Sequence, residues 1–524
     1  MKILASSFFL TVLLVIIFQG CTSLGLFQSS LIGEKAITSD IIRKDIFFLA
    51  SDSMKGRNTP SPELDIAANY IASEFKSYGL QPVDGSYFQK INLTIVNLAE
   101  DNHLKINKDG KVTSFKIKDE FTPFEITANK EVNAPIVFAG YGITTPEYNY
   151  DDYANIDVKG KVVFVLRHEP GEEDSTSIFM GKKMTEYAQV SEKSKIAFEH
   201  GAIGMLVATD PMNHSSLTPR GFPWPSLSKN IPEDALPMTL SMPEEKKIPV
   251  VQVGEEVIKL LFSSVDSLKK IQCEIDSTLK SKTFELTGAT TSLKTTTKVK
   301  ELSAKNVVGF IEGSDTTLKN EIVIIGAHYD HVGYKKKHDD STDYIFNGAD
   351  DNASGTSGVM AIAAGFAAMK QKPKRSVLFM TFAGEEKGLF GSEAYVKHPL
   401  LPLNKTVAML NLDMIGRNSV DTLYIIGAPK SPDLAKINED ENRSIGFILS
   451  LAMEKYFGQS DHYSFYKKKI PILFYHSGDQ PDLHKVTDSP EMINTEKAAR
   501  ISRLAFRTAW RIANEDKNYK IISK

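Results

Sequence analysis

Residues 322–330 read Ile-Val-Ile-Ile-Gly-Ala-His-Tyr-Asp, a short apolar run that ends in a histidine and an aspartate. Three later segments also pair an apolar run with following acids or a histidine: 377–382 before Glu385-Glu386, 407–412 before Asp413, and 471–475 before His484. Runs this short and apolar are typical of parallel strands that are buried on both faces. Because open α/β sheets bind ligands outside the carboxyl ends of their strands, we expect these side chains to meet at one edge.

The order of the segments predicts an α/β fold with a mixed, mostly parallel sheet sandwiched by helices. Residues 62–78 have the capping serine, first-turn proline and apolar spacing of a core-facing helix, and residues 498–512 predict a closing amphipathic helix. Between these helices, residues 131–289 contain strand-like runs and a long loop at 210–245 rich in Pro, Ser and Met. We therefore expect a β-rich domain, 131–289, inserted into an α/β domain made of 34–130 and 290–524.

Composition limits the class of protein. The chain has 524 residues, of which 42% are hydrophobic and 24% charged, as in an ordinary globular protein with more than one domain. The net charge of −3 gives no electrostatic footprint for nucleic acid, so no nucleic-acid partner is expected. The chain contains only two cysteines, Cys21 and Cys273, which excludes a disulfide framework.

The N-terminus has the features of an export signal. Lys2 precedes a mostly apolar stretch up to Phe18, and Gly20 stands directly before Cys21. This pattern resembles a bacterial lipoprotein signal: residues 1–20 would be removed, Cys21 would be lipidated, and 21–33 would be a tether. We therefore expect an exported cell-envelope lipoprotein, facing the periplasm or the cell surface, that is attached to the membrane through its N-terminal lipid. A plain secretory signal and a membrane anchor helix are the alternatives.

Several acids lie where a metal site would need them. A histidine that binds a metal through one ring nitrogen needs an acceptor for the other, and Asp330 follows His328 by two residues. Residues 348–355, with Asp350 and Asp351 in a Gly/Ser/Asn turn before a helix, place carboxylates near the positive end of a helix dipole. Each motif alone has an ordinary structural explanation, such as a core histidine or an acidic capping turn.

The pair Glu385-Glu386 suits metal-dependent hydrolysis. Adjacent carboxylates at a strand end repel each other unless one binds a cation and the other carries a proton during the reaction. Hydrolysis of an amide needs both functions, a metal ligand and a general base. Residues 460–463, Ser-Asp-His-Tyr, add Asp461, His462 and Tyr463 as candidate substrate-binding residues. His462 and His476 compete with His484 for the last ligand position.

These motifs, in this order, resemble the M28 family of zinc aminopeptidases. The resemblance rests on residues 326–330, 348–355, 382–386, 411–415 and 460–462, together with the early stretch 49–57. It covers most of the chain beyond the signal, and the insertion at 131–289 resembles a protease-associated domain. The chain departs from the family pattern after His484, where Lys485-Val486 replace the usual Thr-Pro.

The resemblance implies a zinc-peptidase fold that binds two zinc ions per chain, and it assigns a role to each motif residue. Asp351 would bridge the ions, with a cis peptide after it. His328 and Asp413 would complete one metal site, and Glu386 and His484 the other. Glu385 would be the general base and acid, and Asp330 would orient His328.

The expected activity is removal of N-terminal residues from peptides by water that two zinc ions activate. The partners would be peptides with a free amino terminus. A carboxypeptidase or a glutaminyl cyclase on the same fold is the first alternative, and a non-catalytic surface binding protein is the second. A dead scaffold would lose ligands, whereas all five are present. The side chain preferred at the cleaved end, the oligomeric state and the role of the insertion do not follow from the sequence.

We predict that Cys21→Ser will release the protein from the membrane fraction or block its processing, because the thiol that would carry the lipid is lost. Membrane fractionation of cells expressing each form measures this. Stable membrane association of a fully processed Cys21→Ser protein would point to another anchor.

Overall fold

The computed structural model describes residues 31–179, 181–228, 238–335 and 343–522, and within them the chain forms two compact units. The first unit contains the chain up to Asn92 and again from Leu302, and the second contains Leu93–Glu301. Strands β1 (Phe88–Leu98) and β13 (Thr297–Ile311) carry the chain from the first unit into the second and back.

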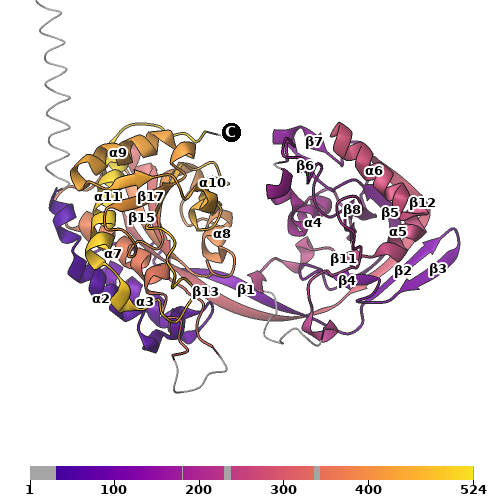
Figure 1. Ribbon diagram of the computed structural model, residues 1–524, viewed down its shortest axis with the longest axis horizontal. Helices are drawn as coiled ribbons and strands as arrows, with labels where there is room; N and C mark the ends of the chain where they lie inside the picture. Colours follow the sequence, from indigo (N-terminus) through magenta and orange to yellow (C-terminus); the bar gives the residue numbers. More distant parts are fainter. Residues whose placement is uncertain (1–30, 180, 229–237, 336–342, 523–524) are drawn as a thin grey trace, which may run out of the picture. The chain divides into compact units, whose positions relative to one another are not determined.

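The first unit is built around a nine-stranded mixed sheet in the order β10-β1-β13-β15-β14-β16-β19-β17-β18 (Figure 1). Four neighbouring strands are parallel: β15 (Ser376–Phe382), β14 (Ile322–His328), β16 (Thr406–Leu412) and β19 (Ile472–His476). β14, β15 and β19 are buried at every residue. The predicted mixed, mostly parallel sheet is confirmed. The other strands are β17 (Thr422–Ile426), β18 (Ile448–Ser450) and the short β10 (Met238–Leu240).

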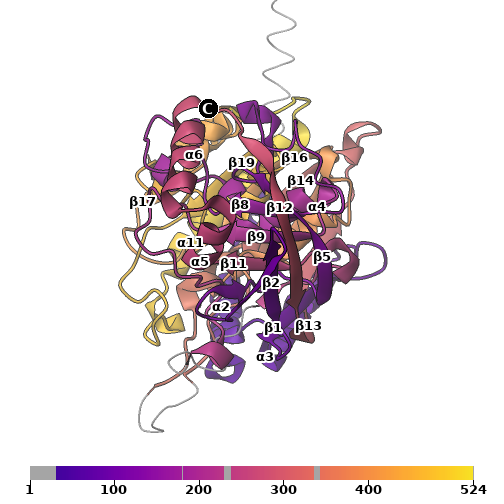
Figure 2. The same ribbon diagram turned by 90° about the vertical axis from the view of Figure 1, so that its right-hand side faces the viewer.

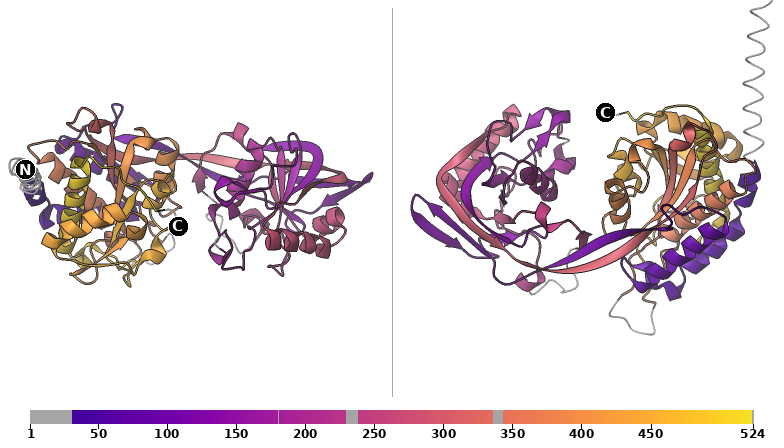
Figure 3. Two further views of the ribbon diagram at one scale, coloured as in Figure 1. Left: turned by 90° about the horizontal axis from the view of Figure 1, so that it is seen from above. Right: turned by 180° about the vertical axis from the view of Figure 1, so that it is seen from behind.

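Helices cover both faces of this sheet. Alternate residues of each strand point to opposite faces, so each strand contributes side chains to two cores. Phe379 of β15 packs against α3 (Pro62–Ser77) and α7 (Gly355–Ala367), while Leu378 and Met380 join a core with α8 (Phe390–Lys397) and α10 (His462–Tyr466). Helices α2 (Ser39–Leu49) and α11 (Thr495–Asn514) pack beside α7, and α9 (Pro432–Ile445) packs on α11. Figure 3 shows the indigo N-terminal helices next to the yellow α11, although they come from opposite ends of the chain.

The second unit contains an eight-stranded sheet in the order β3-β2-β12-β5-β8-β9-β11-β4. Its parallel strands are β5 (Lys130–Ala139), β8 (Val162–Leu166), β9 (Gly204–Ala208) and β11 (Val250–Val253), the last three of which lie side by side in Figure 2. The other strands are β2 (His103–Lys108), β3 (Lys111–Phe115), β4 (Phe121–Pro123) and β12 (Thr283–Thr295). Helix α4 (Val190–Glu199) packs on one face, and α5 (Glu255–Phe262) and α6 (Val265–Thr278) pack on the other.

The second unit is longer than the insertion at 131–289 that the sequence predicted. It begins at Leu93 because β2 and β3, which precede residue 131, belong to its sheet. β2 pairs with β12, and β3 pairs with β2. These two strands are short and partly exposed, so their residue pattern does not indicate which sheet they join.

The proposed signal and lipidation site at Cys21 lies outside the residues that the structure describes. Within those residues, none of the helices is long and apolar enough to span a membrane.

Candidate metal centre and active site

The parallel strands of the first unit bring the predicted site residues to one edge of the sheet. His328 is the last residue of β14, and Asp413 directly follows β16. Glu385 and Glu386 lie just beyond β15, and His484 lies in the loop after β19. Because His328 pairs with Phe382 across β14 and β15, these strand ends are level with each other.

The first group of possible metal ligands consists of His328, Asp351 and Asp413. His328 Nε2 lies 3.3 Å from Asp351 Oδ1 and 3.4 Å from Asp413 Oδ1. All three side chains are buried. The other oxygen of Asp413, Oδ2, accepts a hydrogen bond of 2.9 Å from the Ser460 hydroxyl, which fixes the direction of Oδ1.

The second group consists of His331, Asp351, Glu386 and His484. His484 Nε2 lies 3.1 Å from both Asp351 Oδ2 and Glu386 Oε2. His331 Nδ1 lies 2.7 Å from Glu386 Oε1 and 3.6 Å from Asp351 Oδ2. Asp351 therefore offers one oxygen to each group, which is the arrangement of a bridging carboxylate.

Backbone bonds hold Asp351 in this place. It lies in the turn Ala349–Ser354 directly before α7, and the peptide bond between Asp351 and Asn352 is cis. The carboxylate of Asp488 accepts the N–H groups of Asp350 at 3.0 Å and of Asp351 at 3.1 Å. The cis peptide that the family resemblance implied is therefore present.

Glu385 stands next to both groups without belonging to either. Its Oε2 lies 3.9 Å from His328 Nε2, and its backbone N–H donates to Asp330 Oδ1 at 3.2 Å. Thr59 donates to the other oxygen of Asp330 at 2.8 Å. Asp330 therefore positions the backbone of Glu385.

Asp330 contacts His328 through a different atom from the one that the sequence predicted. His328 Nδ1 lies 3.2 Å from the backbone oxygen of Asp330 and 3.7 Å from its carboxylate. The backbone oxygen is thus the closer acceptor, because the carboxylate is engaged by Thr59 and the Glu385 N–H. A backbone carbonyl fixes the tautomer of a ligating imidazole as well as a carboxylate does.

Burial and neighbouring charges shift the pKa values of several site residues strongly. Burial raises the pKa of Glu385 well above its usual range, and the negative charges of Asp413 and Asp461 raise it further. Burial likewise raises the pKa of Asp461 to about 7. Hydrogen bonds to Asp351 and Glu386 raise the pKa of His484 to about 10. These shifts describe a centre with an excess of buried negative charge, which attracts cations.

Arg57 is a fully buried cation that ties the site loops together. Its guanidinium donates to the backbone oxygens of Leu49, of Tyr329 at 2.9 Å, of Asn347 at 2.7 Å and of Gly348 at 2.9 Å. These bonds connect the end of α2 with the loop after β14 and the turn that contains Asp351. The sequence analysis had placed Arg57 in a motif without giving it a role.

The two alternatives for the last ligand position, His462 and His476, make other contacts. The Nε2 of His462 lies 2.7 Å from the backbone oxygen of Phe457, and burial lowers the pKa of this imidazole to about 3. His476 Nδ1 accepts the Gly478 N–H at 2.8 Å. The position of His484 in the second group therefore favours it over both. Of the three candidate substrate-binding residues, Asp461 and His462 are fully buried and Tyr463 is half-buried.

His331 is a site residue that the sequence analysis missed. It follows Asp330 directly and is fully buried against Glu386. The signal was present as the spacing His-x-Asp-His in residues 328–331. The family resemblance assigns the ligand role to the first histidine of that spacing, His328, so His331 received no role.

The residues present fit a pair of metal ions. Two groups of nitrogen and oxygen donors share Asp351, and the ligand atoms of each group lie within 4.8 Å of one another. Asp413 Oδ1 is buried and makes no hydrogen bond within the part of the chain that the structure describes. Such an atom is costly to bury unless a cation pairs with it. Imidazole and carboxylate are common ligands of zinc.

Histidines and acids gathered at the carboxyl edge of a mixed α/β sheet are the arrangement expected of a metal-dependent hydrolase. Residues 306–509 match the model of peptidase family M28, and residues 132–261 match the model of the PA domain. The chain is thus similar to M28 peptidases over one region and to PA domains over another. The predictions of a peptidase, and of similarity to the M28 family and to a PA domain, are confirmed.

Similar proteins are known from bacteria and fungi. Aminopeptidase YwaD of Bacillus subtilis is 26% identical over 443 residues, which cover 80% of this chain and 79% of the relative. A probable leucine aminopeptidase of Trichophyton verrucosum is 30% identical over 207 residues, which cover 37% of this chain and 54% of the relative. Among solved structures, an aminopeptidase from Aneurinibacillus sp. strain AM-1 is 20% identical with a TM-score of 0.46, over 93% of this chain and 97% of that one.

We predict that His331→Ala will weaken zinc retention about 10–100-fold, because loss of a hydrogen-bonded partner frees the Glu386 carboxylate to turn. His331→Asn should keep more zinc than His331→Ala, since its amide can still donate near the position of Nδ1. Zinc content after dialysis against a weak chelator measures both, with the exposed His398→Ala as control. Equal zinc retention in all three variants would show that His331 has no part in the centre.

Proposed function

We propose that the protein is an aminopeptidase that uses two zinc ions and a glutamate base to remove residues from the amino terminus of peptides. The observation that carries the proposal is the pair of donor groups that share Asp351, with Glu385 beside them. The similarity to aminopeptidase YwaD over 79% of that relative's length supports the choice of reaction.

Each ion would have its own residues. His328 and Asp413 would hold one, Glu386 and His484 would hold the other, and Asp351 would bind both. When bound, zinc supplies Lewis acidity, which makes water more acidic near neutral pH and polarises a carbonyl group. His331 would hold the Glu386 carboxylate in position through the 2.7 Å contact.

Glu385 is the proton carrier of the proposed reaction. Its side chain is 12% exposed, so substrate and water can reach it, while Asp330 fixes its backbone. Burial and neighbouring acids raise its pKa, which makes the carboxylate a stronger base. Glu385 takes a proton from the attacking water and delivers it to the amine that leaves.

The charges around the centre favour recognition of an amine over recognition of a carboxylate. Arg417 is a cation close to the motifs, and its Nη2 donates to Asp482 at 2.7 Å, so part of its charge is offset there. Asp350 is the neighbour of Asp351, and its carboxylate accepts the Gly416 N–H at 2.7 Å. Burial raises its pKa to about 8. Asp461 is fully buried, whereas the Glu385 side chain is 12% exposed, so Glu385 is the acid that an ammonium group can reach.

We also propose that the mature protein is an exported lipoprotein attached through Cys21. The support for this is the sequence of residues 1–21 alone. Its substrates would then be peptides outside the cytoplasm.

Glu385→Gln and Glu386→Ala should fail in different ways. Glu385→Gln removes the proton carrier and should lower kcat by roughly 10²–10⁴ with zinc retained. Glu386→Ala removes a ligand and should lose zinc as well as activity. Zinc per chain and single-turnover rates measure the two effects. Equal zinc loss in both variants would contradict the assigned roles.

A matched pair of peptides tests which end of the substrate is read. One peptide has an acetylated amino terminus and the other an amidated carboxyl terminus, with the same sequence between. We expect the amidated peptide to be cut from its amino end and the acetylated one to resist, because the free ammonium group is the recognised feature. Cleavage of the acetylated peptide alone would identify a carboxypeptidase. Conversion of an N-terminal glutamine peptide into its pyroglutamyl form, with release of ammonia and no cleavage of the chain, would identify a cyclase.

A further inference from the structure

A second cluster of histidines and acids lies in the second unit, at the ends of two parallel strands. β8 and β9 pair in register, with Leu166 opposite Ala208 at their carboxyl ends. His168 lies two residues after β8, and Asp210 lies two residues after β9. The same displacement on paired strands brings the two side chains together, and His168 Nδ1 contacts Asp210 Oδ2 closely.

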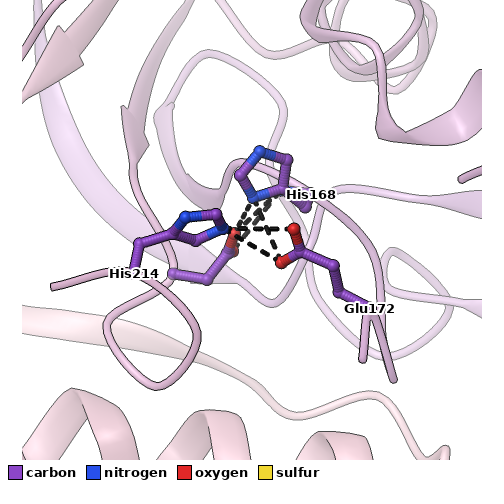
Figure 4. Close-up of side chains that lie close together, drawn as sticks. His168, Glu172 and His214 are labelled. Carbon is purple, nitrogen blue, oxygen red and sulfur yellow. Dashed lines mark hydrogen bonds and ion pairs between the residues drawn. The ribbon is translucent and has the colours of Figure 1, made fainter. Parts of the chain in front are cut away.

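Two further side chains complete the cluster, as the close-up in Figure 4 shows for His168, Glu172 and His214. Glu172 Oε2 lies 3.5 Å from His168 Nδ1 and 3.1 Å from His214 Nε2. His214 is brought back by a turn in which its N–H donates to the Asp210 backbone oxygen at 3.2 Å. The centroids of the His168 and His214 rings are 4.6 Å apart.

The distances from Glu172 to the two imidazoles fit a single ion among the four side chains. One ligand atom from each side chain can be chosen so that all lie within 4.8 Å of one another. Tetrahedral ligands at zinc bond lengths lie roughly 3.3 Å apart, which is close to the 3.1 and 3.5 Å found here. Two imidazoles with two carboxylates suit zinc, whereas calcium and magnesium prefer an all-oxygen set.

Supporting hydrogen bonds direct the carboxylates toward the centre. Asn213 Nδ2 donates to Glu172 Oε2 at 3.1 Å, and the His168 backbone N–H donates to Asp210 Oδ2 at 3.3 Å. Partners of this kind orient metal ligands in known sites. Asp210 is fully buried and Glu172 is 5% exposed, so their negative charges need nearby compensation.

The nearby cation does not provide that compensation by direct bonds. The fully buried Lys193 ammonium donates to the backbone oxygens of Tyr141 and, at 2.7 Å, of His168. It makes these bonds to carbonyl groups while the carboxylates face the imidazoles. The remaining explanation without a metal is a network of hydrogen bonds and ion pairs among the four side chains.

We propose that His168, Glu172, Asp210 and His214 form a binding site for a zinc ion in the second unit, separate from the peptidase centre. The ion would link the loop after β8 to the loop after β9. All four side chains belong to the second unit, so the site is independent of the proposed peptidase function.

Zinc binding by the full-length mature protein tests the site. His214→Ala is the informative variant, because this side chain is 35% exposed and its loss should leave the fold intact. To remove the contribution of the peptidase centre, the measurement is repeated in an Asp351→Ala background. We expect His214→Ala to hold about one zinc ion per chain fewer in both backgrounds, and Zn²⁺ to raise the Tm of the second unit only when His214 is present.

Matched controls separate the site from general damage. His103→Ala changes another histidine of the second unit, which contacts Ser292 and Glu131 outside the cluster, and should keep all of its zinc. His168→Ala should reproduce the zinc loss of His214→Ala. If His214→Ala and its parent bind the same amount of zinc in the Asp351→Ala background, the cluster is an ion-pair network and the proposal is overturned. Binding of calcium without zinc would overturn it as well.

Discussion

The first unit depends on the burial of many carboxyl groups at one edge of a sheet. Asp351, Asp413 and Glu386 face the same small volume, and Glu385 and Asp461 stand next to them. Like charges at these distances repel strongly in a poorly hydrated interior. The imidazoles of His328, His331 and His484 compensate part of this charge. The geometry becomes favourable when cations are held between the acids, so the fold and the proposed chemistry have the same electrostatic requirement.

The surrounding structure holds these acids in place mostly through backbone groups. The guanidinium of Arg57 donates to backbone oxygens at four positions of the chain, so it holds the loops together. Its positive charge also offsets part of the negative charge of the nearby acids. Asp488 binds the N–H groups of the turn that contains Asp351. Rigid support of this kind keeps ligands close to a productive geometry and limits the reorganisation that the reaction requires.

The same principle of sheet geometry recurs in the second unit. β8 and β9 end level with each other, as β14 and β15 do, and each pair brings a histidine and an acid to the carboxyl edge. The two clusters differ in their acids: the centre of the first unit has an isolated Glu385 next to its ligands, whereas the cluster at His168 is a closed set of four side chains. A closed set suits a structural role, and an additional base suits catalysis.

The sequence by itself determined the strands and the edge at which chemistry occurs, because apolar runs followed by acids have a local signature that survives without any contact information. The resemblance of residues 326–330, 348–355, 382–386 and 411–415 to the M28 motifs added the proposed ligand set. Only the tertiary structure brought His331 to Glu386, placed the His462 ring against the Phe457 backbone oxygen, and turned Asp350 toward Gly416. It alone joined His168 to His214 across 46 residues. The physical reason is that the direction of a side chain depends on the register of paired strands and on competing hydrogen bonds, which are long-range properties of the fold.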